Sequence, residues 1–118
     1  MTQRTGAATG AANEVRLIGR VSRQPEERVL PSGDAMWSFS VVVPRAEGRT
    51  RSRQTVDALD CAAWSARSRR SVAGWNANDV VEVHGAVRRR FFKTGGGAAS
   101  RFEIEVTRGR VIHRAASA

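Results

Sequence analysis

The stretch DVVEVHGAVRRRFF at residues 79–92 decides the fold. Along it, small or apolar side chains alternate with mostly polar or charged ones. The first set is Val81, Val83, Gly85 and Val87, and the second is Glu82, His84, Ala86, Arg88 and Arg90. A period of two is typical of a β-strand with one buried face. We therefore expect a long strand here, and a hairpin tip at residues 93–100, which contain three consecutive glycines.

The same alternation predicts strands on both sides of this stretch. They are expected at residues 15–21, 35–43 and 55–64, and in a last strand that begins near Phe102 and extends towards Ile112. In that last strand, Phe102, Ile104 and Val106 are expected to point inward. Residues 65–76 are the only segment that suits a helix, and the helix would be short. Five strands with one short helix between the third and the fourth are the element order of the OB-fold, a Greek-key barrel. The predicted fold class is therefore all-β.

The charge balance favours a polyanionic partner. Among 118 residues, 20 Lys and Arg oppose 11 Asp and Glu, a formal net charge of +9, and Lys93 is the only lysine. Arginine presents a planar set of donors that suits phosphate oxygens. A bias of the genome towards G and C would explain the choice of arginine over lysine, but not the excess of positive charge. We expect nucleic acid as the partner.

Composition also argues against several classes of protein. One cysteine and two histidines supply neither a disulfide nor a structural zinc site, so no metal or organic cofactor is expected. No paired carboxylates, nucleophile elbow or catalytic Cys/His set stands out, so an enzyme is not expected. No apolar run has the length of a membrane span or of a secretory signal, so we expect a cytoplasmic location. We expect one domain at residues 13–113 between disordered ends at 1–12 and 114–118.

Three ordered blocks of sequence resemble one family. They are NEVRLIGRVSRQPEERVLPSG at 13–33, ALDCAAW at 58–64 and VVEVHGAVRRRFF at 80–92. From residue 13 to about 111 the chain resembles the OB domain of bacterial single-stranded DNA-binding proteins. The resemblance implies sequence-independent binding and protection of single-stranded DNA, in replication, repair or recombination, by a homotetramer at the nucleoid.

Matched position by position, the resemblance implies that bases stack on Trp64 and Phe92. The chain departs from the family at Ala58, where an aromatic residue is usual, and at Glu47, in a loop that often offers another. It also has no acidic residue after Glu105, whereas family members that organise replication end in an acidic tip. We therefore expect that it does not recruit the family's tail-dependent replication and repair partners.

The residues themselves indicate a similar site. Arg88, Arg90 and Phe92 would share one side of their strand, with Phe91 and Lys93 beside them, so that charges hold phosphates and a ring accepts any base. The alternative is a solvated strand edge, where charges deter aggregation.

Two further features belong to this expected site, each with an alternative. Trp64 lies on the polar face of its strand as a second platform, or else packs under the helix. A basic loop could wrap a flexible strand, or could simply be solvated; its arginines are Arg45, Arg49, Arg51 and Arg53.

Two rival hypotheses remain for the function. OB-folds also bind single-stranded RNA, and competition between oligo-dT and oligo-U would separate the two ligands. A paralogue that has lost DNA-binding aromatics could instead serve as a protein–protein subunit, and would show no affinity for DNA at low salt.

Overall fold

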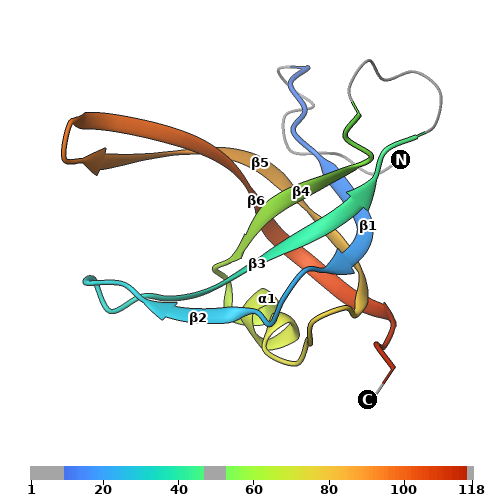
Figure 1. Ribbon diagram of the computed structural model, residues 1–118. Coiled ribbons are helices and arrows are strands. Elements are labelled where there is room, and N and C mark those ends of the chain that lie inside the picture. The colour runs from blue at the N-terminus through green and yellow to red at the C-terminus, as the bar shows by residue number, and fades with distance from the viewer. Residues whose placement is uncertain (1–9, 47–52, 117–118) are drawn as a thin grey trace.

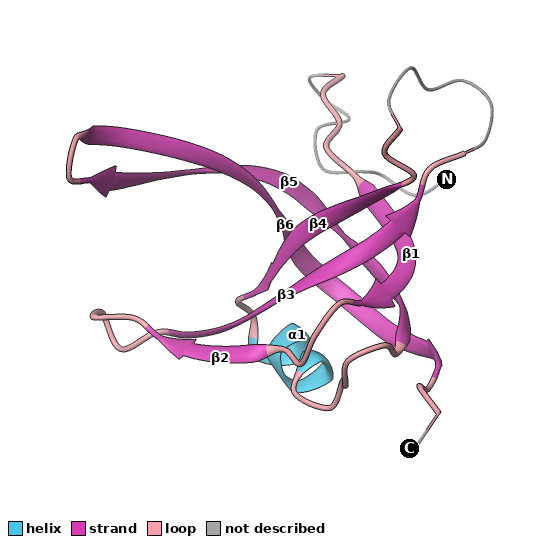
Figure 2. Ribbon diagram, viewed as in Figure 1, coloured by secondary structure: helices cyan, strands magenta, loops and turns pink. Residues whose placement is uncertain are grey.

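The computed structural model describes residues 10–46 and 53–116. They form six strands and one helix, which are β1 (Val15–Val21), β2 (Glu26–Val29), β3 (Ala35–Pro44), β4 (Val56–Ala63), α1 (Ala66–Val72), β5 (Val80–Thr94) and β6 (Gly97–His113) (Figure 1). The all-β class and the single short helix between the third and fourth expected strands are confirmed, and Figure 2 shows how strands dominate the molecule.

One strand was missing from the sequence-based expectation. Residues Glu26–Val29 pair with β3 as a short antiparallel strand, with Glu26 opposite Ser38 and Val29 opposite Ala35. All four residues of β2 are exposed, so no alternation marks this strand in the sequence. The turn that follows creates it, because Gly33 adopts a φ of 92° and Leu30 and Asp34 are joined by a backbone hydrogen bond.

Five of the strands close into a barrel. β1 pairs with both β5 and β3, β3 pairs with β4, and β6 pairs with β5. The circle is completed by a short parallel contact between β4 and β6, in which Cys61 lies opposite Ile104. Closure leaves these strands without a free edge where they meet, which is the architecture expected of an OB-fold.

The core lies inside this barrel and follows the alternation of the strands. Its centre consists of buried valines from β1, β3 and β5, together with Phe39, Cys61, Ile104 and Val106. Trp75, which follows α1, is 3% exposed and meets Phe39 edge to face, with ring centroids 5.3 Å apart. Trp37 packs against the same cluster, so both tryptophans contribute to the core.

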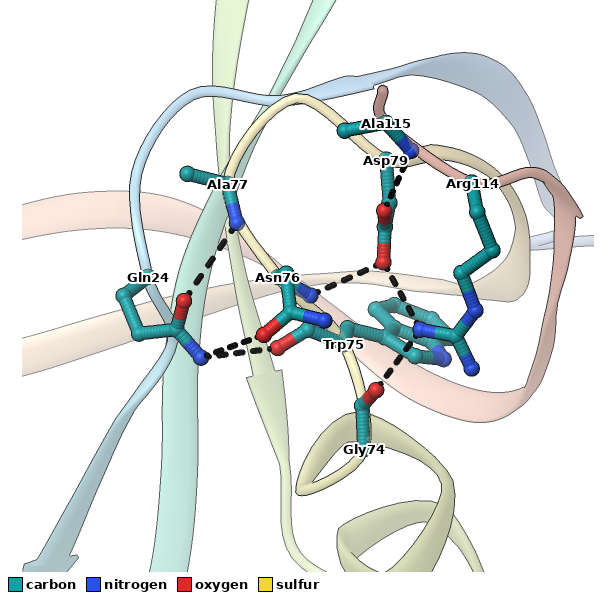
Figure 3. A network of polar contacts seen from close by, with 8 residues as sticks. All are labelled: Gln24, Gly74, Trp75, Asn76, Ala77, Asp79, Arg114 and Ala115. Carbon is teal, nitrogen blue, oxygen red and sulfur yellow. Dashed lines mark hydrogen bonds and ion pairs between the residues drawn. The ribbon is translucent and has the colours of Figure 1, made fainter. Parts of the chain in front are cut away.

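The segment after α1 is held by a network of polar contacts (Figure 3). The carboxylate of Asp79 is almost fully buried and accepts hydrogen bonds from the backbone N–H groups of Asn76 and Ala115 and from Arg114. Burial alone would raise the pKa of Asp79, but these donors outweigh it and lower the pKa. Contacts to the barrel therefore continue two residues past the expected domain boundary at 113.

Two hairpins extend away from the barrel, β2–β3 and β5–β6 (Figure 1). In the β5–β6 hairpin, residues 88–94 and 97–103 pair only with each other, and we call residues 88–103 the hairpin arm. The tip is shorter than the expected 93–100, since the strands run to Thr94 and restart at Gly97. The prediction that Phe102 points into the core is wrong: it shares a strand face with Ile104 and Val106, but lies beyond the barrel and is 63% exposed.

Candidate nucleic-acid interface

The hairpin arm has two faces with different chemistry. Alternation along β5 places Arg88, Arg90 and Phe92 on one side, which we call the Phe92 face, and puts Phe91 on the opposite side. Arg101 lies directly opposite Arg90 and so joins the Phe92 face. The sequence grouped Arg88, Arg90 and Phe92 correctly, but the arm separates them from Phe91 and Lys93.

Acidic residues hold two of the three arginines of the Phe92 face, Arg88 and Arg90. Arg88 donates to Glu105 at 3.0 Å, while Arg90 donates to the buried carboxylate of Glu103 and lies 3.5 Å from Glu105. Both guanidinium groups are thus oriented by the chain before any ligand arrives. Their charges are partly neutralised by these carboxylates.

Trp64 sits directly beside this face. It follows the last residue of β4, and the guanidinium of Arg90 lies over its ring, 5.3 Å from the centroid. The ring is half-buried, and its Nε1 is enclosed without a hydrogen-bond acceptor among the residues that the structure describes. Phe92 is 45% exposed farther along the same face. Arg90 therefore lies over Trp64 and shares a strand face with Phe92, the two rings that the sequence singled out.

A groove adjoins the Phe92 face. Its volume is about 180 Å³, and it lies between the β2–β3 hairpin and β6. Glu103 lines it and also holds Arg90, which covers Trp64, so the groove and the Phe92 face are continuous. The groove is also lined by three arginines that the sequence analysis did not select, namely Arg23, Arg28 and Arg101. Arg101 would have been found if the strands had been expected to continue to the hairpin tip.

The basic loop after β3 is only partly described. Arg45 forms a two-point contact with Asp57, at 2.8 and 3.1 Å, which raises the pKa of Arg45 and lowers that of Asp57. Arg53 is exposed at the other end of the loop. Arg49 and Arg51 lie outside the described residues.

The barrel wall away from the arm carries a separate charge cluster. Glu82 is nearly buried and accepts hydrogen bonds from Arg16 at 2.6 Å and from Arg110 at 2.9 Å, with His84 at 3.2 Å. The Arg16 hydrogen bond is the main cause that lowers the pKa of Glu82 to about 2, against the opposing effect of burial. Glu82 is therefore a local charge partner of Arg16 and Arg110.

This cluster predicts a loss of stability in acid. Because the pKa of Glu82 is lower in the folded chain than its ordinary value of 4.5, its contribution is present above about pH 4.5 and is lost as the pH falls towards 2. We expect Glu82→Gln to flatten the pH dependence of unfolding in that window. Urea unfolding between pH 5 and pH 2.5 measures this, and equal slopes for the variant and the parent chain would contradict it.

Other kinds of site find little support in the described part of the chain. No three His, Cys, Asp or Glu side chains within residues 10–46 and 53–116 are grouped so that they could hold a metal ion. Burial, with help from Asp60 and Glu103, raises the pKa of the Cys61 thiol to about 12. Within the same ranges, the helix is too short and polar to span a membrane.

Curated relatives are similar in sequence to this domain. A single-stranded DNA-binding protein of Oceanobacillus iheyensis is 27% identical over 85 residues, which cover 72% of this chain and 53% of that protein. One of Deinococcus radiodurans is 29% identical over 110 residues, covering 92% of this chain and 36% of that protein. The chain thus spans about half the length, or less, of these curated relatives.

Solved structures share the fold. The Plasmodium falciparum SSB in complex with ssDNA superposes with a TM-score of 0.67 at 20% identity, covering 98% of this chain and all of that one. The mitochondrial single-stranded DNA binding protein Rim1 of Saccharomyces cerevisiae gives 0.64 at 9% identity, covering 86% of this chain and 96% of that one. Finally, the family model described as "Single-strand binding protein family" matches residues 12–112. The chain therefore belongs to the single-strand binding protein family.

Proposed function

We propose that this chain binds single-stranded DNA without sequence preference and protects it during replication, repair or recombination. The observation that carries this proposal is the continuous surface formed by Trp64, Arg90 and Phe92, which runs into the groove beside β6. The exposed ring of Phe92 and the half-buried ring of Trp64, next to oriented guanidinium groups, suit a ligand that presents flat bases on a charged backbone.

The binding mode follows from the groups on this surface. Every base has a π-face, so stacking on Trp64 and Phe92 accepts all four bases. Arginines along the groove supply charge for the phosphates, and displacement of their counterions favours binding. Duplex DNA keeps its bases stacked on one another and cannot offer them to the rings. Stacking therefore distinguishes a single strand from a duplex.

Oligomeric state is part of the same proposal. The resemblance to bacterial single-stranded DNA-binding proteins supports a homotetramer acting at the nucleoid. Native mass measurement of the chain, with and without oligo-dT, tests the assembly directly.

Replacement of either ring is expected to weaken binding while the fold survives. Trp64→Ala and Phe92→Ala should each cost about 1–3 kcal/mol of binding free energy, the usual contribution of one stacked base. Quenching of tryptophan fluorescence on addition of oligo-dT measures the affinity, except for Trp64→Ala, where a labelled oligonucleotide replaces it.

The half-buried position of Trp64 makes a stability control necessary. Val29→Ala is a suitable matched variant, since Val29 is an exposed apolar residue on β2, and it should leave affinity unchanged. If Trp64→Ala unfolds the chain, the ring supports the fold under the helix and the stacking role is wrong. Competition by oligo-U equal to that by oligo-dT would favour single-stranded RNA as a ligand. Lack of any affinity at low salt would favour a protein–protein subunit.

A further inference from the structure

The opposite side of the hairpin arm, which we call the Phe91 face, is aromatic and cationic. Arg89, Phe91 and Lys93 alternate along β5 on this side, and Phe102 lies directly opposite Arg89. Phe91 is 73% exposed and Phe102 is 63% exposed. The guanidinium carbon of Arg89 lies 5.4 Å from the centroids of both rings, so the three side chains form one patch.

The charge on this face is not neutralised by the chain. Arg89 donates to the hydroxyl of Ser100 at 3.1 Å and has no ion pair with any carboxylate of residues 10–46 and 53–116. Arg88 and Arg90, by contrast, are both paired with glutamates on the Phe92 face. Arg89 is therefore more readily available to an anionic ligand than Arg88 and Arg90 are.

The strand geometry explains why the rings are uncovered. Phe102 shares its strand face with the core residues Ile104 and Val106, but it lies past the end of the barrel, where none of the strands that the structure describes packs over it. Two large exposed rings on a free hairpin are unfavourable in water unless a ligand covers them. The ring spacing is held by the strand pairing and by the cation between them, so the patch is formed before binding.

We propose that the Phe91 face is a second surface for single-stranded DNA, separate from the Trp64 and Phe92 surface. This inference rests on the proposed function of the chain. A strand that leaves the Phe92 face passes over the arm and stacks bases on Phe91 and Phe102, while Arg89 and Lys93 meet its phosphates.

Charge complementarity selects this ligand over another copy of the chain. The pairing places two cations and no acid on this face of the arm, so a copy that presented the same face would add like charges, whereas a polyanion adds attraction. Aromatic rings flanking a guanidinium are also the groups on which unpaired bases stack.

The two surfaces differ in the strand length that they require. A strand of about 8 nucleotides lies within the range of about 4–16 for one OB-fold and can fill the Phe92 face alone. Contact with both faces requires a strand that continues around the arm. The Phe91 face should therefore contribute to the affinity of long strands only.

The test compares Phe91→Ala/Phe102→Ala with Trp64→Ala, using labelled oligo-dT of about 8 and about 35 nucleotides. We expect the double variant to bind the long strand at least about tenfold more weakly, the effect of losing one stacked base or more, and to bind the short strand as the parent chain does. Trp64→Ala should weaken both. Arg89→Gln should lower the salt slope for the long strand by about 0.7 and leave the short strand unchanged.

The possible outcomes separate this inference from the proposed function. Unchanged long-strand affinity in the double variant, with Trp64→Ala still weakened, overturns only the second surface. A smaller native mass for the double variant would mean that the Phe91 face joins copies of the chain, and this result overturns the second DNA surface. If the parent chain binds neither strand, both proposals fail. Thermal unfolding shows whether each variant is folded. If the double variant is unfolded, Arg89→Gln, which keeps both rings, tests the second surface in its place.

Discussion

The affinity for oligo-dT is expected to fall about 10³-fold when the salt concentration rises tenfold. Each phosphate neutralised on a single strand contributes about −0.7 to the slope of log affinity against log salt, so about five contacts give a slope near −3.5. The arginines most able to make such contacts are those of the groove and of the Phe91 face, namely Arg23, Arg28, Arg101 and Arg89.

Ion-paired arginines should contribute less to this slope. Arg45, Arg88 and Arg90 each already face a carboxylate, so a phosphate must compete with an acid of the chain. Titration with oligo-dT over a series of NaCl concentrations measures the slope, and thermal unfolding at the same concentrations shows that the fold is not the cause. A flat response would show that arginines do not supply the affinity.

Gly85→Ala is expected to destabilise the barrel severely. A Cβ atom at this position would lie 2.0 Å from the carbonyl oxygen of Glu105, and a backbone atom cannot move aside as a flexible side chain can. Gly85 sits at an irregularity of the β5–β6 pairing and also pairs with Val15 of β1, so a shift there disturbs three strands. Overpacking of this kind should cost about 3 kcal/mol, and lower the Tm by on the order of 15 °C.

Gly95→Ala provides the matched control for this change. Gly95 lies at the tip of the arm, where an added Cβ meets nothing within 4 Å and the backbone is not in the left-handed region. Its Tm should stay close to that of the parent chain. Equal Tm values for Gly85→Ala and the parent chain would show that β6 can move away from β5 without cost.

Alternation was sufficient to predict the strands that build the barrel. Val81 and Val83 are buried and Glu82 reaches the outer wall, because neighbouring side chains of a strand must point to opposite sides. The same signal could not reveal β2, whose residues are all exposed and whose pairing depends on the turn at Gly33. The helix was expected within residues 65–76, but α1 is shorter and ends at Val72.

The site was predicted only in part, because charge alone does not show how a side chain is used. The sequence singled out Trp64 and Phe92, and the structure shows that Arg90 lies over Trp64 and on the same strand face as Phe92. The sequence could not show that Arg88 and Arg90 are held by glutamates from β6. Those glutamates are 13 to 17 residues away along the chain, and only the hairpin register brings them to the arginines. Arg101 and Arg28 were missed for the same reason.

The sequence by itself determined the period of the strands, the place of the helix and the excess of positive charge, since all three depend on the order of residues along the chain. Tertiary structure alone decided where the barrel ends and the hairpin arm begins. That boundary places Ile104 in the core and Phe102 in solvent, although both lie on one face of the same strand. The physical reason is that burial depends on what packs opposite a side chain, and no strand among residues 10–46 and 53–116 covers Phe102.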